Sequence, residues 1–236
     1  MSHSFQRMKT TNYGRCHMCD TYVYFWGCEC NQCQLICHKK CLKKLTIMCP
    51  HAPLGPKCSI LNKDIESLPE DEMVPILVRK CTEEIERRSL KRPGIYRMSG
   101  VATRVEKLLK SFESGPHLID LIDVSTNDIT SVLKIFLREL KEPLVPNSIY
   151  KLYIDVGRVF RHEGTLKDDA YVLTGDAEHS ELIRQMRLCV SKLTPHRLAT
   201  MRHMFGHLNR IAAYSSQNHM TPAAIGIIFA PTLFRP

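Results

Sequence analysis

Eight cysteine and histidine residues in the first fifty positions constrain the fold of this chain more than any other feature. In chain order they are His3, Cys16, Cys19, Cys30, Cys33, His38, Cys41 and Cys49. A Cys-x2-Cys pair suits zinc, because a tight turn can bring both sulfurs to about 2.3 Å from one tetrahedral ion. Eight ligands complete two shells of four and leave no position for water, which indicates structural rather than catalytic zinc. A segment this short buries little apolar surface, so metal binding must supply its folding free energy.

The use of cysteine elsewhere in the chain favours metal thiolates over disulfides. Eight of the eleven cysteines lie between Cys16 and Cys49, the total is odd, and the N-terminus has no apolar signal core. Such a pattern is typical of a reducing compartment. No apolar run reaches the roughly 20 residues of a membrane span. We therefore expect a cytoplasmic protein, with peripheral association with membranes as an option.

The order of these ligands resembles the phorbol-ester/diacylglycerol-type zinc finger, the C1 domain of many signalling proteins. The resemblance covers residues 3–49 and implies two interleaved sites. One Zn²⁺ would be bound by His3, Cys30, Cys33 and Cys49, and the other by Cys16, Cys19, His38 and Cys41. Spacing alone does not fix this pairing, and a RING- or PHD-like arrangement would distribute the same ligands differently.

Departures from that family bear on lipid binding. Only ten residues separate Cys19 from Cys30, fewer than in members that bind diacylglycerol. Tyr13 stands where those members have a proline, and Trp26-Gly27 stands where they have Gln-Gly. The aromatic run at residues 22–26 is interpreted as a strand packed on the small core of the module rather than a membrane-inserting tip. The sequence thus predicts an atypical C1 domain that does not act as a diacylglycerol receptor.

The positive charge of the chain is concentrated in the same segment. Residues 1–57 carry eight Lys or Arg and two acidic residues, a formal +6 out of +9 for the whole chain. Such a basic patch is either a solvated surface or a contact site for an anionic membrane surface or an acidic protein partner. No nucleic acid partner is expected, because a recognition helix with a basic face and an extended stacking surface are both missing.

Beyond the zinc-binding segment the chain shows helical periodicity. We predict a zinc-stabilised, β-rich module at residues 1–50, a linker at 51–57 and an all-α domain at 58–236. Apolar residues recur with helical spacing over 105–112 and 129–140, and further helices are expected to begin near Pro75 and Pro195. The glycines of residues 157–178 suggest a long surface loop.

Motifs for an enzyme site of the chain's own are missing: there is no phosphate-binding loop, Gly-x-Ser-x-Gly or His-Glu-x-x-His. His203 and His207 have helical i, i+4 spacing, and we interpret them as packed or exposed residues rather than a metal pair. Two other stretches stand out. Arg97 lies in the segment 94–100, between glycines, and Lys134 and Arg138 share a helix face opposite the apolar stripe.

Together these stretches resemble the GTPase-activating domain of Rho-family regulators (RhoGAP), from about residue 58 to the end. Asn218-x-Met220 and the Phe-Ala-Pro-Thr-Leu run at 229–233 are similar to the late signature of that family. The resemblance implies that the chain is not an enzyme on its own. A partner Rho-family small GTPase would bind GTP and Mg²⁺, and this chain would insert Arg97 as an arginine finger. Lys134 and Arg138 match positions that support the loop and contact the GTPase.

Two departures from the RhoGAP pattern leave an alternative open. Ala224 stands where the family usually has an asparagine that hydrogen-bonds the GTPase, and the chain stops at Pro236, where members typically continue. A fragment or a truncated domain is therefore expected. The alternative is a non-catalytic scaffold that binds a GTPase or a membrane. The sequence does not specify which Rho-family GTPase is the partner.

Overall fold

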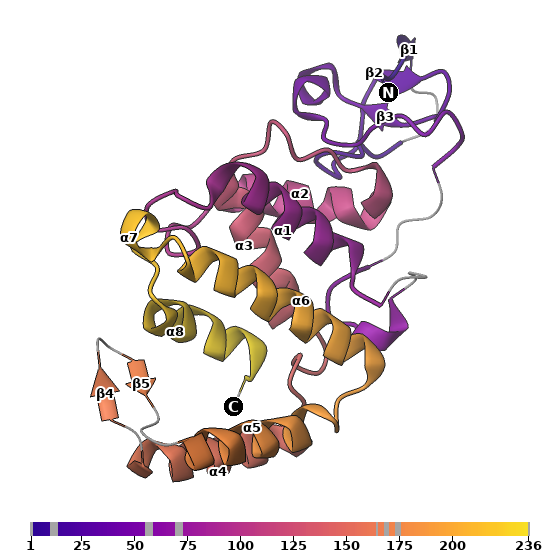
Figure 1. The fold of residues 1–236 in the computed structure, drawn as a ribbon. Helices are drawn as coiled ribbons and strands as arrows, with labels where there is room; N and C mark the ends of the chain where they lie inside the picture. The colour runs from indigo at the N-terminus through magenta and orange to yellow at the C-terminus, as the bar shows by residue number, and fades with distance from the viewer. Residues whose placement is uncertain are drawn as a thin grey trace. The chain divides into compact units, whose positions relative to one another are not determined.

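The computed structural model describes residues 2–9, 14–54, 59–68, 73–163, 165–167, 170–172 and 176–235 (Figure 1). The chain divides into two compact units. The first unit contains Met1–Ile60 and Ser99–Val132, and the second contains Leu61–Met98 and Leu133–Pro236. Tyr13 and linker residues 55–57 lie outside the described residues. The predicted boundaries at residues 50 and 58 therefore stay predictions.

The N-terminal part of the first unit is a small antiparallel sheet. Its strands are β1 (Phe5–Lys9), β2 (Trp26–Cys30) and β3 (Ile36–Cys37), in the order β1-β2-β3, followed by the short 3-10 helix η1 (Lys39–Lys44). Strands this short form a sheet of marginal stability on their own. The buried residues here are mainly the predicted cysteine ligands together with Val23 and Leu35. The core of this sheet is therefore largely a core of thiols.

The first unit also contains α2 (Ala102–Ser114), the 3-10 helix η3 (Pro116–Leu118) and the first half of α3 (Thr126–Arg138). The chain just before Cys49 pairs with the segment after α2. Ile47 forms an antiparallel bridge with Ile119, and the Met48 N–H donates to the Leu118 carbonyl at 2.8 Å. Cys49, a predicted metal ligand, thus comes directly after two residues whose backbone pairs with Leu118 and Ile119.

The second unit is helical. It contains η2 (Ile65–Ser67), α1 (Ile76–Ser89), α4 (Asn147–Glu163), α5 (Asp176–Val190), α6 (Pro195–Ala212), α7 (Ser215–Asn218), α8 (Pro222–Leu233) and the second half of α3. In Figure 1, α6 runs alongside α1 and contacts α8, while α4 and α5 lie side by side. The apolar stripe predicted for α3 is fully buried, including Leu133, Phe136 and Leu137. The prediction of a helical domain is confirmed.

The segment at residues 157–178 differs from the surface loop that was expected. Helix α4 continues to Glu163, a short hairpin of β4 (Thr165–Lys167) and β5 (Ala170–Val172) follows, and α5 begins at Asp176. Gly157 lies inside α4, and a Cβ placed there would meet nothing within 4 Å, so this glycine does not mark a turn. Tyr171 and Val172 favour a strand. The all-α prediction is therefore wrong for this hairpin.

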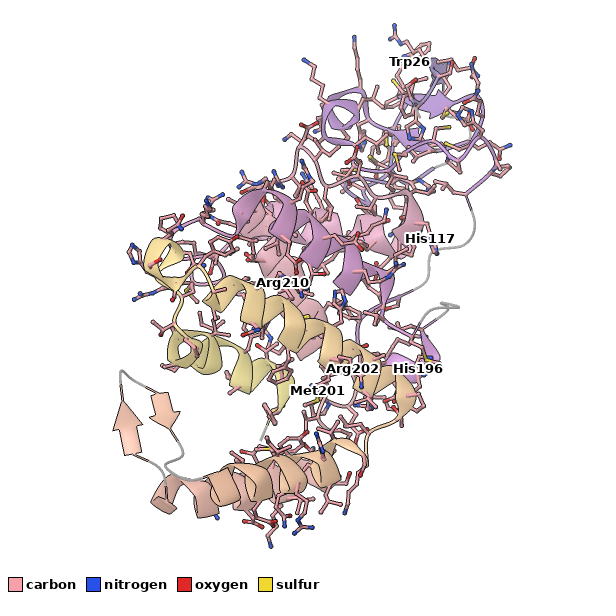
Figure 2. All side chains as sticks on the ribbon, in the orientation of Figure 1. Trp26, His117, His196, Met201, Arg202 and Arg210 are labelled. Carbon is pink, nitrogen blue, oxygen red and sulfur yellow. The ribbon has the colours of Figure 1, made fainter. Side chains whose placement is uncertain are left out.

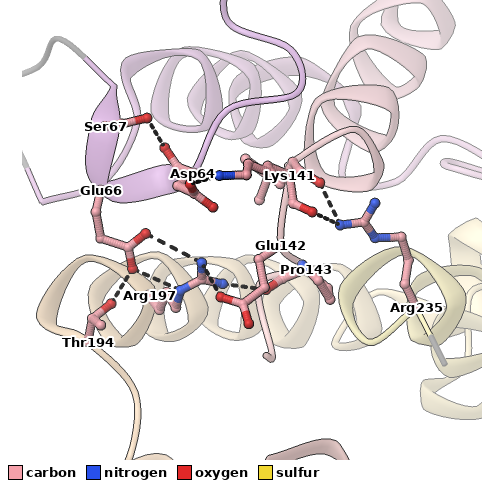
Figure 3. Close-up of polar contacts among 10 residues, drawn as sticks. Asp64, Glu66, Ser67, Lys141, Glu142, Pro143, Thr194, Arg197 and Arg235 are labelled. Carbon is pink, nitrogen blue, oxygen red and sulfur yellow. Dashed lines mark hydrogen bonds and ion pairs between the residues drawn. The ribbon is translucent and has the colours of Figure 1, made fainter. Parts of the chain in front are cut away.

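A buried arginine joins three segments of the second unit (Figure 3). Arg197 lies in the first turn of α6 with its side chain 3% exposed, and it pairs with Glu66 at 2.8 Å and Glu142 at 3.0 Å. Its guanidinium also donates to the carbonyl of Pro143, and the Thr194 hydroxyl donates to Glu66 at 2.5 Å. The network ties η2 and the loop after α3 to the start of α6.

Among the described residues, the helices lack the combination of length and apolar character that crossing a bilayer requires.

Candidate functional site

Arg97 lies in a tight turn of the segment that follows α1. The Arg97 N–H donates to the Gly94 carbonyl at 2.9 Å, and the Met98 N–H donates to the same oxygen at 3.1 Å. Gly94 has a φ of 66°, in the left-handed region that favours glycine. The side chain of Arg97 is exposed, and within the described part of the chain its guanidinium has no hydrogen-bond or ion-pair partner. The turn therefore presents an uncommitted cation to solvent.

The residue before the arginine is buried on every side. Tyr96 is 1% exposed, and its ring meets that of Phe229 edge to face with centroids 4.8 Å apart. Its φ of 68° is also left-handed, which costs about 1–3 kcal/mol for a residue other than glycine. The surrounding contacts must offset that cost. The buried Tyr96 side chain thus ties the exposed Arg97 to the core of the second unit.

Of the two cations predicted on α3, the structure brings one to the loop. The Lys134 ammonium donates to the Tyr96 carbonyl at 2.6 Å. Burial lowers the pKa of Lys134, and the nearby charge of Arg138 lowers it further. Arg138 is exposed, and its guanidinium pairs with Glu139 at 3.3 Å. Lys134 therefore holds the peptide next to Arg97, whereas Arg138 remains on the surface.

Glycine is required at positions 94 and 100 for two different structural reasons. Gly94 supplies the positive φ of the turn, as described above. In the first unit, a Cβ on Gly100 would lie 2.5 Å from Asp128 Oδ1 and 2.8 Å from the Asn127 carbonyl oxygen. The Gly100 N–H donates to Ser131 Oγ at 2.9 Å. Gly100 is thus required for close packing against the start of α3.

Asn218, from the late signature, is a buried structural residue. Its side-chain amide donates to the carbonyls of Leu90 and Ile211, both at 2.8 Å, and its side-chain oxygen accepts from the Met220 N–H at 2.8 Å. Its own carbonyl accepts from the Gly94 N–H at 2.8 Å. Asn218 therefore fixes the base of the arginine turn to the ends of α1 and α6.

Ala224, which stands where the family usually has an asparagine, lies in the first turn of α8. The backbone N–H of Ala224 donates to Thr221 Oγ1 at 3.2 Å, which caps the helix, and the side chain of Ala224 is half-buried. The residue thus keeps its place in the helix start but offers no polar group to a partner.

Behind Tyr96 lies a polar network that the sequence revealed only as two spaced histidines. The Tyr96 hydroxyl lies 2.7 Å from His207 Nε2, and His207 Nδ1 lies 2.7 Å from Glu86 Oε1. Arg210, labelled on α6 in Figure 2, donates to the same carboxylate oxygen at 2.7 Å. His203 bonds separately to Thr82, with 2.7 Å between its Nε2 and the hydroxyl. Both histidines are packed side chains, in agreement with the sequence interpretation.

Burial and partners shift the ionisation of this network. Burial lowers the pKa of His207 to about 4 even though it bonds to Glu86. Burial acts to raise the pKa of Glu86, but hydrogen bonds from Arg210 and His207 outweigh it, and that pKa is lowered overall. At neutral pH the imidazole is therefore neutral and the carboxylate is ionised.

The first unit brings together two groups of four potential metal ligands. One group is His3, Cys30, Cys33 and Cys49; the other is Cys16, Cys19, His38 and Cys41, and within each group the ligand atoms lie within 4.8 Å of one another. The Cys30 and Cys49 sulfurs are 3.8 Å apart, and His3 Nδ1 is 3.4 Å from the Cys33 sulfur. Sulfurs about 2.3 Å from a tetrahedral ion would have similar separations. The ten described cysteines form no disulfide.

Both histidines also have the outer contact that metal-binding imidazoles usually make. Nε2 of His3 lies 2.8 Å from the Ile47 carbonyl oxygen, and Nε2 of His38 lies 3.1 Å from the Tyr22 carbonyl oxygen. Such a bond fixes the tautomer and leaves Nδ1 free to face the cluster. The donor sets therefore suit two closed tetrahedral sites.

The aromatic run at residues 22–26 is more exposed than was expected. Val23 is fully buried, but Phe25 is 75% exposed and Tyr24 is 60% exposed. Trp26, labelled in Figure 2, is half-exposed, with the guanidinium of Arg7 4.3 Å from the centre of its ring. The interpretation of the whole run as packed on the module core holds for Val23 only, because the remaining side chains exceed what so small a core can cover.

Comparisons with known proteins agree with the helical architecture and the motifs. The RhoGAP domain model matches residues 75–236. Rho GTPase-activating protein 45 of Mus musculus is 38% identical over 242 residues, covering 100% of this chain and 22% of that protein. GEM-interacting protein of Homo sapiens is 39% identical over 238 residues, covering 100% of this chain and 24% of that protein. The chain thus spans about a quarter or less of the length of these curated relatives.

A solved structure gives the same result. The crystal structure of human Rho GTPase activating protein 15 matches with a TM-score of 0.64 and 31% identity, covering 76% of this chain and 79% of that one. The residues that match the RhoGAP domain model include the α-helices of the second unit and the segment that carries the arginine turn. The chain belongs to the RhoGAP domain family.

Proposed function

We propose that this chain stimulates GTP hydrolysis by a Rho-family small GTPase by supplying Arg97 in trans. The observation that carries the proposal is the combination of an exposed guanidinium, which pairs with none of the described residues, and a rigidly held backbone. Family membership supports the same activity. The GTPase would bind GTP and Mg²⁺, so the reaction would take place in the partner, to which this chain would contribute Arg97.

The chemistry of the arginine accounts for the acceleration. A guanidinium is permanently charged and has donors in a rigid fork, which suits the oxygens of a transferring phosphoryl group. Because negative charge there develops in the transition state, the contact raises turnover more than it raises ground-state affinity. Arginine fingers of this kind contribute about 10³–10⁵ in rate, or about 4–7 kcal/mol. Lys134 would hold the loop, and Arg138 would contact the GTPase directly.

Single-turnover GTP hydrolysis by Rho-, Rac- and Cdc42-type GTPases tests the proposal. Wild-type chain should accelerate hydrolysis by at least one of them, and Arg97→Ala should lower the saturating rate by about 10³ or more. Arg202→Ala is the matched control, because Arg202 is an exposed arginine on α6 of the same unit. Binding without acceleration of any of the three would replace the proposal with a non-catalytic scaffold, which is the outcome that Ala224 motivates.

The two ligand groups are proposed to hold two structural Zn²⁺ ions, in a module of the C1 type. Closed thiolate and imidazole shells with backbone-bonded histidines favour zinc over other divalent ions. Zinc bound there would fold and hold the module. Elemental analysis should give two zinc ions per chain, and a value of one or none would refute the assignment.

We further propose that this module directs a cytoplasmic chain to an anionic membrane surface. The support is the basic charge of the segment together with Phe25 and Trp26 exposed beside Arg7. Vesicles with and without phosphatidylserine, each with and without diacylglycerol, test this idea. Binding should follow the anionic lipid and ignore diacylglycerol. Failure to bind any of the vesicles would contradict the proposal and favour an acidic protein as the partner of this surface.

A further inference from the structure

We propose that Tyr96, His207 and Glu86 form a positioning network that sets the orientation of the Arg97 turn, by fixing the hydroxyl end of the tyrosine whose peptide carries the arginine. The proposal rests on the proposed function of Arg97 as a finger. Its basis is the uninterrupted series of 2.7 Å contacts from Glu86 through His207 to the Tyr96 hydroxyl, all within the second unit.

The direction of each hydrogen bond follows from the chemistry of the groups. An ionised Glu86 carboxylate can only accept, so His207 Nδ1 must carry its proton and donate. The neutral ring then has a lone pair on Nε2, and the Tyr96 hydroxyl must donate to it. The lowered pKa values of His207 and Glu86 agree with this protonation state. Arg210 donates a further hydrogen bond to the Glu86 carboxylate. A single donor pattern therefore holds the phenol in one place.

The two ends of Tyr96 are held by different groups. The hydroxyl is held by His207, while the carbonyl oxygen accepts from Lys134 at 2.6 Å. Between them the backbone has a φ of 68°, a conformation that this residue type rarely adopts. If the hydroxyl end is released, the backbone can relax from that conformation. The next side chain, that of Arg97, would then lose its direction while it keeps its charge and exposure.

The expected signature is a loss of turnover without a loss of binding. A finger that points away at times reduces the fraction of complexes competent for hydrolysis, whereas the surface that binds the GTPase is unchanged. Tyr96→Phe removes one oxygen and should lower the saturating single-turnover rate about tenfold, with the half-saturating concentration changed less than about twofold. Affinity for the GDP–aluminium fluoride form of the GTPase should fall with the rate, and affinity for a GTP-analogue form should not.

Two substitutions of the histidine separate positioning from general structure. The amide of His207→Gln reaches about as far as Nε2 and can accept from Tyr96, whereas that of His207→Asn reaches only about as far as Nδ1. His207→Gln should retain most of the saturating rate, and His207→Asn should behave as Tyr96→Phe does. His203→Asn is the matched control, because His203 lies one turn away on α6 and bonds to Thr82 instead. It should retain the wild-type rate.

The experiment measures saturating rate, half-saturating concentration and melting temperature for wild type, Arg97→Ala, Tyr96→Phe and the three histidine variants. If wild type accelerates hydrolysis and Arg97→Ala does not, the finger is established. Equal saturating rates for Tyr96→Phe, His207→Asn and wild type would then overturn the positioning network. Rates for His207→Gln and His207→Asn that fall together, in proportion to melting temperature, would show a purely structural role and also overturn it. If wild type gives no acceleration, the proposed function fails first.

Discussion

The N-terminal module with the two ligand groups and the arginine turn would achieve rigidity in opposite ways. In the module the sheet is short, and the buried side chains are largely the sulfurs that face the proposed ions. The turn has no such external group. Its geometry depends on Lys134, Asn218 and His207, each buried or half-buried and each bonded to the loop or to Tyr96. The contrast teaches that the proposed metal ions would stabilise one region, whereas the chain's own polar side chains stabilise the other.

The largest expected effect is on the metal-held side of the comparison. Cys30→Ser removes a buried ligand, and the apparent free energy of zinc binding that folds such sites is about 10 kcal/mol or more. Hydrogen exchange should therefore show loss of protection in β1–β3, with protection of α1 and α6 retained. Cys28→Ser is the matched control, since Cys28 belongs to neither ligand group. Loss of protection in α1 and α6 as well would show that the two regions are not independently stabilised.

The next effect is on the side held by polar side chains. Arg197→Met should lower the free energy of unfolding by about 2–3 kcal/mol, because it removes the donor of a carbonyl and of two partly exposed carboxylates. Urea unfolding monitored by circular dichroism measures the change. Arg202→Met on the same helix is exposed and should change stability by less than about 0.5 kcal/mol. Similar values for the two variants would mean that the network adds nothing to stability.

A smaller effect distinguishes the two cations of α3. Lys134→Met loses the hydrogen bond to the Tyr96 carbonyl and should lower the saturating rate of GTP hydrolysis about tenfold, or about 1.4 kcal/mol. Arg138→Ala should instead raise the half-saturating concentration a few-fold, because the side chain is exposed and does not touch the loop. If Lys134→Met changed mainly the half-saturating concentration and Arg138→Ala mainly the saturating rate, the proposed roles of the two residues would be wrong.

The smallest effect concerns pH. His207 has a pKa of about 4 in the folded chain against about 6.5 when unfolded, so the unfolded chain binds the extra proton as pH falls below 6.5. Stability is therefore lost between pH 6.5 and about 4. From pH 7.5 to 5.5, wild type should lose about 1 kcal/mol more than His207→Gln in urea unfolding. Groups remote from His207 are common to both proteins, and Glu86, whose pKa Arg210 and His207 lower from 4.5 despite its burial, titrates below this pH range. Identical losses would mean that His207 does not titrate as described.

The sequence predicts the helices well, because the apolar stripes of α2 and α3 repeat with the helical period and are buried as expected. The sequence spacing also pointed to candidate ligands, which the structure groups in space. The continuation of α4 to Glu163 was missed, since a glycine in a helix interior has the same local appearance as a glycine in a loop. Asp128 lies within α3, and its carboxylate accepts from the Val101 N–H and from Arg104.

The supporting network of the arginine turn was beyond sequence reasoning for a different reason. His207 lies 111 residues along the chain from Tyr96 and 121 from Glu86, and each residue type has many other uses. Only the crossing of α1 and α6 in the second unit brings them together. Arg197 has the same character, because its carboxylate partners come from two distant segments. Long-range contacts between ordinary residues leave no local pattern to find.

The interleaving of the two ligand groups has a consequence for synthesis on the ribosome. The group that begins with Cys16 is complete once Cys41 has emerged, whereas the group that begins with His3 must wait for Cys49. At about 5–20 residues per second that delay is on the order of a second. With Zn²⁺ bound as proposed, the inner site would close first around residues 16–41, and the outer site would then join the two ends of a segment that is already ordered. The order of the ligands along the chain would thus determine the order in which the two sites assemble.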